Sequence, residues 1–249
     1  LDGMGESTAP ARPTALRRRL LVVAAVVVVF IALVIVAQLI PQSPTVSAPA
    51  STANPTATTE AQPATELPIV RRQEGDPAAV GAVDAPVVLV MWTDMRCPFC
   101  AVFSRETLPA LTQEYIDSGQ VRLEVHTVAF FGEQSADAAV AALAAGDQGR
   151  YFEFLHTVYD AAPDDARAEL PRDVLIAFAE QAGVPDIARF TAALDEPALM
   201  QSVQATTATA QQIGVGSVPF FVVGETALAG AQPVDVFRSF LDSALPGAG

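Results

Sequence analysis

The segment VVLVMWTDMRCPFC, residues 87–100, joins the only two cysteines of the chain, Cys97 and Cys100, to a strongly apolar run. Residues 87–93 are almost continuously apolar and largely β-branched, which predicts a buried central strand. Residues 101–115 predict a helix. A Cys-x-x-Cys pair between a strand and a helix is typical of a redox-active dithiol, because the N-terminus of the helix favours the thiolate of the first cysteine.

The composition bounds the class of protein. The 249 residues carry a formal net charge of -14, and all 14 basic residues are arginines. An acidic chain is a poor partner for nucleic acid, whose phosphates need cations, so no nucleic-acid partner is expected. Since both cysteines belong to one motif, none remains for a structural disulfide. The globular part must therefore be stabilised by its own core.

The N-terminal part predicts a membrane anchor. Residues 1–19 form a short polar tail that ends in three arginines, and residues 20–40 follow as an apolar run. A helix over that run is about 31 Å long at ~1.5 Å per residue, enough to cross a hydrocarbon core of ~30 Å. The arginines predict a cytoplasmic tail. The alternative is a cleaved signal peptide, with a candidate cleavage site at residues 46–48.

Residues 41–68 are rich in Pro, Thr, Ala and Ser. Such a composition does not bury a core and predicts a disordered, extended linker. The chain becomes globular from about Ile69, so we expect one folded domain over residues 69–249. The predicted order is tail, membrane helix, linker and domain.

Within the domain, the pattern predicts an α/β fold. Residues 121–128 alternate as a second strand, and residues 133–213 are helical throughout. Aromatic residues at helical spacing in 151–159 predict core packing rather than a cofactor site. Residues 220–229 predict a hairpin and residues 234–245 a final amphipathic helix. The order is βαβ, a helical block, then ββα.

Two linked motifs carry a resemblance to a known family. GAVDAP at residues 81–86 and Asp94 precede the CPFC motif, and GVGSVP at residues 214–219 precedes the hairpin. With a helical insertion between them, the region from about 74 to 245 resembles the DsbA-like thiol-disulfide oxidoreductases. The resemblance implies a thioredoxin-like fold, with a central mixed β-sheet flanked by helices and an all-helical insertion at about 133–213.

The resemblance also implies roles for individual residues. Cys97 corresponds to the exposed nucleophile and Cys100 to the buried resolving cysteine. Pro219 corresponds to the cis-proline that lies against the dithiol. Val218 is expected to present its backbone to an extended substrate peptide, in the manner of strand addition.

The residues between the cysteines tune the redox potential. Pro98 suits the first turn of a helix, where a missing N–H is tolerated. Phe99 stands where oxidising members of the family often have histidine. Because a phenyl ring offers no N–H and no charge to the sulfur, we expect a less extreme thiolate at Cys97.

A further departure concerns proton transfer to Cys100. Many relatives have a buried acid where this chain has Met91. Asp94 matches the family, but residues 91 and 94 of a strand face opposite sides, so Asp94 does not simply replace that acid. Asp94 is alternatively a loop residue that bonds locally. Glu124 is another candidate carboxylate, and Arg96 either favours the Cys97 thiolate or is a solvated surface residue.

The sequence favours no metal and no cofactor. Together with the two cysteines, His126 and His156 would make four zinc ligands. Their spacing does not fit a compact zinc site, so no zinc site is expected. The dithiol itself is the redox group. Phe130 and Phe131 suggest an apolar groove near it.

The predicted function is that of a membrane-tethered extracytoplasmic oxidoreductase that forms disulfides in exported proteins. Such a location lets disulfides persist. The family implies a membrane redox partner, either a quinone-linked oxidase or a reductant. No dimerisation domain is recognisable, which favours an oxidase over an isomerase. The alternatives are a disulfide reductase or isomerase fed by a membrane electron donor, or a non-catalytic binding or chaperone module on the same fold.

Overall fold

The computed structural model describes residues 68–247. The predicted tail (1–19), membrane helix (20–40) and nearly all of the linker (41–68) lie outside the described residues. Within residues 68–247, none of the helices combines the length and the apolar character that a membrane span requires.

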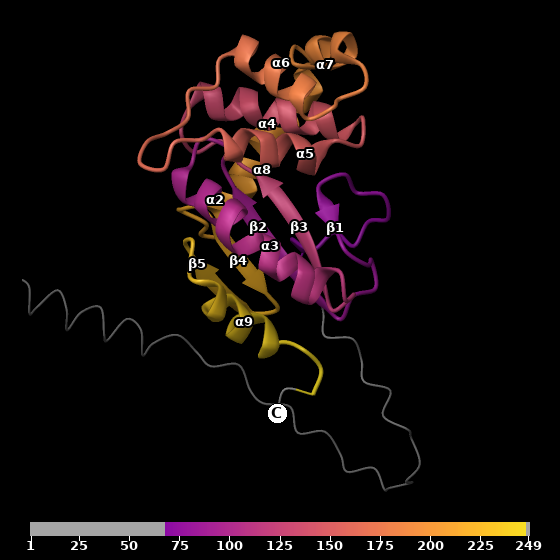
Figure 1. The fold of residues 1–249 in the computed structure, drawn as a ribbon, viewed down its shortest axis with the longest axis vertical. Coiled ribbons are helices and arrows are strands. Elements are labelled where there is room, and N and C mark those ends of the chain that lie inside the picture. The colour runs from indigo at the N-terminus through magenta and orange to yellow at the C-terminus, as the bar shows by residue number, and fades with distance from the viewer. Residues whose placement is uncertain (1–67, 248–249) are drawn as a thin grey trace, which may run out of the picture. The chain divides into compact units, whose positions relative to one another are not determined.

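A five-stranded mixed sheet forms the centre of the domain, in the order β1-β3-β2-β4-β5 (Figure 1). The strands are β1 (Ala79–Val80), β2 (Val87–Thr93), β3 (Val121–Thr127), β4 (Phe220–Val223) and β5 (Thr226–Ala229). Strands β2 and β3 are parallel, and the remaining pairs are antiparallel. The mixed sheet confirms the predicted fold class. The two-residue strand β1 was not predicted.

Strand β2 is the central strand of the sheet, as its composition predicts. All seven of its residues are buried. It pairs with β3 from Val87↔Val121 to Thr93↔Thr127, so the two strands end side by side. Whatever follows Thr93 and Thr127 in the chain is therefore brought to the same edge of the sheet.

The helix after the dithiol differs from the simple α-helix expected. It runs as α2 (Pro98–Val102), η1 (Phe103–Thr107), α3 (Leu108–Leu111) and η2 (Thr112–Ile116), of which η1 and η2 are π-helical. Pro109 explains the first π turn, because a proline ring clashes with the carbonyl four residues earlier in an α-helix. The wider turn lets the Leu108 amide donate to Phe103 instead.

Five helices make up the insertion: α4 (Glu133–Gly146), α5 (Tyr151–Asp160), α6 (Arg172–Gln181), α7 (Ile187–Ala193) and α8 (Pro197–Gln212). Helices α4, α6 and α7 lie beyond one end of the sheet (Figure 1), whereas α8 contacts β3. The aromatic face of α5 is buried, as predicted. The last helix, α9 (Val234–Asp242), packs Phe237 against Phe103 and Phe221 at ring-centroid distances of 5.0 and 4.7 Å.

Candidate functional site

The dithiol occupies the turn between β2 and α2. Cys97 is the N-cap residue of α2, and its amide donates to the Asp94 carbonyl oxygen at 3.0 Å. Pro98 takes the first helical position, where the absent N–H leaves no bond unmade. Both cysteines are free thiols. The strand, the turn and the helix together place the two sulfurs at the edge of the sheet.

The structure corrects one expectation about the nucleophile. Cys97 is only 3% exposed, whereas the resemblance implied an exposed residue. Its Sγ donates to the Val218 carbonyl oxygen at 3.4 Å, and the Val218–Pro219 peptide bond is cis. The chain before β4 therefore covers the sulfur. Phe99 instead is the exposed residue of the motif, at 64%.

The two thiols are shifted in opposite directions. A hydrogen bond from the Cys100 thiol, aided by the Phe99 and Cys100 amides, lowers the pKa of Cys97. Burial raises the pKa of Cys100 well above its usual value, and the neighbouring Cys97 sulfur raises it further. Cys100 is 1% exposed. These opposite shifts make Cys97 the more acidic of the two thiols, which suits a nucleophile and a resolving thiol.

A cavity of about 650 Å³ opens against Cys97. It is lined by residues 97–99, 129–131, 165–167 and 215–218, with Gln211. This cavity gives the dithiol an approach for a substrate chain, even though the sulfur itself is largely covered.

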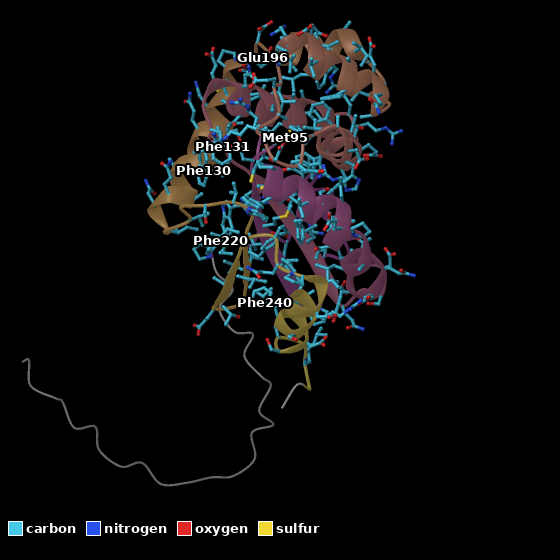
Figure 2. The ribbon with its side chains drawn as sticks, turned by 60° about the vertical axis from the view of Figure 1, so that its left-hand side comes forward. Met95, Phe130, Phe131, Glu196, Phe220 and Phe240 are labelled. Atoms are coloured by element: carbon cyan, nitrogen blue, oxygen red, sulfur yellow. The ribbon has the colours of Figure 1, made fainter. Side chains whose placement is uncertain are left out.

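Phe130 and Phe131 form part of the cavity wall and can be followed in Figure 2, where they lie next to each other. Both are half-buried rather than fully exposed. The Arg167 guanidinium lies 4.3 Å from the centre of the Phe131 ring. The two aromatic residues therefore line a cavity at the dithiol, but its wall also carries polar side chains such as Asp165, Arg167 and Gln211.

Asp94 is buried beside the dithiol and bonds both locally and over long range. Its carboxylate accepts from the Arg96 amide at 2.9 Å, the Phe130 amide at 2.8 Å and the Ser135 hydroxyl at 2.9 Å. Burial raises the pKa of Asp94 in spite of these bonds. Its charge in turn raises the pKa of Cys97. Asp94 holds the turn in place and opposes the thiolate.

Neither Met91 nor Glu124 supplies a carboxylate to the dithiol. Met91 is 2% exposed and packs in the core. Glu124 accepts from Arg122 Nε at 2.8 Å, the Arg71 amide at 2.7 Å and the Arg72 amide at 2.8 Å. The interpretation of Glu124 as a replacement acid is therefore wrong, because its carboxylate instead binds the backbone of Arg71 and Arg72 to β3.

Arg96 fits neither interpretation made from the sequence. Its guanidinium donates to the Phe131 carbonyl oxygen at 2.9 Å and the Ala168 carbonyl oxygen at 2.8 Å, and pairs with Glu169 at 3.1 Å. The side chain is only 13% exposed. Arg96 therefore ties together the two loops beside the cavity instead of facing the Cys97 sulfur or the solvent.

Sequence reasoning missed two hydroxyl groups at the dithiol. Thr93 Oγ1 and the Tyr159 hydroxyl are 2.5 Å apart, and both residues are 1% exposed. Tyr159 also donates to the Asp94 carbonyl oxygen at 3.2 Å. A hydrogen bond from Thr93 acts to lower the pKa of Cys100. The available signal was a tyrosine on an otherwise apolar helix face, since a buried phenol needs a partner.

The histidines lie away from the sulfurs. His126 stacks on Trp92 with ring centroids 5.3 Å apart and contacts the Ile69 carbonyl oxygen at 3.1 Å. Burial lowers the pKa of His126 to about 4. His156 is exposed on α5. Over the part of the chain that the structure describes, no group of three or more His, Cys, Asp or Glu residues is placed to hold a metal ion.

Comparison with known sequences places this arrangement among related proteins. A family model described as thioredoxin matches residues 73–243. Disulfide bond formation protein D of Bacillus subtilis (strain 168) is 23% identical over 176 residues, which cover 70% of this chain and 79% of that protein. Probable disulfide bond formation protein D of Bacillus anthracis is 28% identical over 144 residues, which cover 57% of this chain and 66% of that protein.

Solved structures agree with the fold. The oxidised crystal structure of BdbD from Bacillus subtilis matches with a TM-score of 0.64 at 23% identity, over 70% of this chain and 94% of that one. The thiol-disulfide exchange protein alpha-DsbA2 from Wolbachia pipientis matches with a TM-score of 0.57 at 22% identity, over 66% and 85% of the two chains. At these identities the structures show a shared fold.

Proposed function

The chain belongs to the thioredoxin family as a DsbA-like thiol-disulfide oxidoreductase, and from this premise we propose that it oxidises cysteine pairs of exported proteins. The redox group is the Cys97–Cys100 pair. No other cofactor is needed, because the disulfide itself accepts two electrons. The membrane segment at residues 20–40 tethers the domain outside the cytoplasm, where disulfides persist.

The exchange proceeds in two displacements. A substrate thiolate attacks Cys97 Sγ of the disulfide, a substrate–Cys97 mixed disulfide forms, and Cys100 leaves as a thiolate with the electron pair. A second substrate thiolate then attacks the substrate sulfur of the mixed disulfide, and Cys97 leaves as a thiolate. The substrate loses two electrons and gains a disulfide, while the dithiol is reduced.

The contacts that lower the pKa of Cys97 support the oxidising direction. The Cys100 thiol and two backbone amides stabilise the thiolate of the reduced form. The disulfide has no such charge to stabilise, so these contacts favour the reduced dithiol over the disulfide. A dithiol whose reduced form is stabilised passes its disulfide on to other thiols.

The cavity against Cys97 suits an unfolded substrate segment. Phe99, Phe130 and Phe131 offer apolar contacts, and Val218 lies beside the sulfur just before β4. An extended peptide fits along this backbone by strand addition, with its cysteine at Cys97. The substrate class is therefore exported chains that expose cysteines before they fold.

Each turnover leaves two electrons on the dithiol, which a redox partner must remove. We expect a quinone-linked oxidase in the same membrane. The competing function is a reductase or isomerase supplied by a membrane reductant. The charge of Asp94 favours this alternative, because it raises the pKa of Cys97 and so weakens the oxidising power.

Redox titration of the full-length protein against glutathione buffers tests the direction. Each ~30 mV corresponds to about 1.4 kcal/mol of bias. A potential above that of the glutathione pool supports the oxidase, whereas a low, thioredoxin-like potential supports the reductase. Disulfide transfer to a reduced, unfolded test protein, with Cys97→Ser as the control, tests catalysis. If the wild type and Cys97→Ser transfer equally slowly, the chain is a binding module and the proposal is wrong.

A further inference from the structure

Two buried hydroxyl groups, those of Thr93 and Tyr159, lie near the resolving cysteine. Thr93 ends β2, and Tyr159 reaches it from α5 across 66 positions of sequence. Their oxygens are 2.5 Å apart. The Tyr159 hydroxyl also lies 3.2 Å from the Asp94 carbonyl oxygen. Hydrogen bonding from the Thr93 side chain acts to lower the pKa of Cys100.

These groups satisfy Cys100 in either protonation state. With a Cys100 thiolate, Thr93 donates to the sulfur and Tyr159 donates to Thr93. With a Cys100 thiol, the sulfur donates to Cys97, Thr93 donates to Tyr159, and Tyr159 donates to the Asp94 carbonyl oxygen. A hydroxyl is both a donor and an acceptor and rotates to suit its partners, so the chain of bonds reverses without moving a heavy atom. No buried donor is left unpaired in either state.

We propose that Thr93 is a further catalytic residue of the dithiol, which stabilises the thiolate of Cys100 by a hydrogen bond, and that Tyr159 is a positioning residue that directs the Thr93 hydroxyl to that sulfur. The inference rests on the thiol-disulfide exchange of the proposed function and holds for either direction of electron flow. In that exchange Cys100 carries negative charge whenever it attacks or leaves Cys97 Sγ. A buried thiolate needs such a donor, because burial alone disfavours its charge.

The domain contains a second buried threonine–tyrosine pair of the same kind, which has no cysteine sulfur beside it. Thr127 ends β3 beside Thr93, and its Oγ1 lies 2.5 Å from the Tyr151 hydroxyl, which also comes from α5. Tyr151 is 2% exposed and Thr127 is 7% exposed. Burial raises the pKa of Tyr151 to about 12, and none of the causes involves a cysteine. Substitutions in this pair therefore reproduce the packing change alone.

The test follows the two thiolates released when the reduced full-length protein reacts with 5,5′-dithiobis(2-nitrobenzoate). Cys97 attacks the reagent first, forms a mixed disulfide and releases one aromatic thiolate. Cys100 then attacks Cys97 Sγ, the Cys97–Cys100 disulfide forms, and the second aromatic thiolate leaves with the electron pair. Stopped-flow absorbance at saturating reagent gives the rate of this second step as a function of pH.

We expect Thr93→Val to move the pH midpoint of the second step upward and to slow the step at neutral pH by about tenfold, the low end of the range for a bond to a charged group. Tyr159→Phe should act in the same direction but more weakly. Thr93→Ser, which keeps the hydroxyl, should retain the wild-type profile. Thr127→Val and Tyr151→Phe should leave both the midpoint and the rate unchanged.

The inference is overturned if Thr93→Val and Thr127→Val give the same profile, whether both are slow or both are fast. It is also overturned if Thr93→Ser behaves as Thr93→Val does, because the effect then follows packing and not the hydroxyl. A wild-type protein that releases only one thiolate has no resolving step. That result contradicts the proposed function, and it is distinct from a failure of Thr93 alone.

Discussion

Strands β2 and β3 end in the same way but lead to different chain segments. Each ends on a buried threonine whose hydroxyl meets a tyrosine of α5, Thr93 with Tyr159 and Thr127 with Tyr151. After Thr93 the chain turns into the dithiol. After Thr127 it continues into the loop that carries Phe130 and Phe131. The same kind of threonine–tyrosine contact thus joins the sheet to α5 at two places. Only the contact at the end of β2 has a titratable sulfur beside it.

Comparing the two strand ends distinguishes a contribution to stability from a contribution to thiol-disulfide exchange. Both pairs satisfy buried hydroxyl groups and join the insertion to the sheet, so both contribute to stability. Only the pair at the end of β2 lies near Cys100, whose sulfur gains and loses a negative charge during exchange. A substitution that affects both ends equally reports on folding, and one that affects only the β2 end reports on the dithiol.

Cys100→Ala should have the largest effect, because it removes the sulfur that distinguishes the two ends. Mixed disulfides at Cys97 should persist and turnover should fall to the uncatalysed rate. The pKa of Cys97 should rise, since the Cys100 thiol is its main stabilising contact. The rate of Cys97 alkylation as a function of pH measures this. In this background Tyr159→Phe and Tyr151→Phe should alkylate alike, and a difference between them would contradict the assigned role of Tyr159.

Glu124→Gln should destabilise the fold through β3 without changing the dithiol. Breaking a buried ion pair such as Arg122–Glu124 costs about 3–5 kcal/mol. Chemical denaturation measures the loss, and the exposed pair Arg172–Asp195 provides the control, since Asp195→Asn should cost at most about 1 kcal/mol. If Glu124→Gln also changed the rate of thiol-disulfide exchange, the dithiol at the end of β2 would not be independent of β3.

The same variant has a predicted pH dependence. Burial would raise the pKa of Glu124, but bonds from Arg122 and the Arg71 and Arg72 amides together hold it below its usual value. A lowered folded-state pKa gives stability that is present above the unfolded pKa and is lost as the pH falls through the folded pKa. The gap in stability between wild type and Glu124→Gln should therefore narrow in acid and stay constant near neutrality.

Asp94→Asn should act on the β2 end in the opposite sense to Cys100→Ala. Removing the charge should lower the pKa of Cys97 and speed its alkylation in weak acid by roughly two- to tenfold, the effect of up to about one pKa unit. The amide loses an acceptor for the Phe130 or Arg96 N–H, which costs about 1–3 kcal/mol. Ser135→Ala, which keeps the carboxylate, is the control. Slower alkylation of Asp94→Asn in weak acid would show that the charge does not oppose the thiolate.

Phe99→Ala should have the smallest effect on the domain itself. The ring is 64% exposed, so the free energy of unfolding should change by no more than about 0.5 kcal/mol. Alkylation of Cys97 by a small reagent should stay the same. KM for a reduced protein substrate should rise, because the ring borders the cavity. An unchanged KM would place the substrate on another surface.

The sequence predicted the elements whose signal lies within one segment. The apolar run of β2, the helical insertion and the C-terminal hairpin all follow local patterns, and the observed elements agree with them. Strand β1 has two residues in a loop rich in Gly, Asp and Pro, and only its pairing with β3 defines it. The π turns around Pro109 were missed because a proline in a helical pattern predicts a kink or a break, and a wider turn is a rarer solution.

The residues of the site likewise fall into those predictable from one segment and those that depend on packing between segments. The motif and the resemblance singled out Cys97, Cys100 and Pro219 from their neighbours in sequence, and the structure brings Cys97 to the cis Val218–Pro219 bond. Alternation along the strand predicted that residues 91 and 94 face opposite sides, but it did not show that the Asp94 carboxylate is buried and bonded to Ser135 of α4. The Tyr159–Thr93 contact depends on how the insertion packs on the end of the sheet. No pattern within either segment encodes that distance.

The stacking of Trp92 on His126 gives the molecule a built-in optical reporter. Trp92 is the only tryptophan in the chain, and it directly precedes Thr93 in β2. Its imidazole neighbour has a pKa of about 4, so the ring charge beside the indole does not change over the range in which thiols titrate. A fluorescence change in that range therefore does not arise from titration of His126. Oxidation, reduction and unfolding can all be followed without attaching a dye.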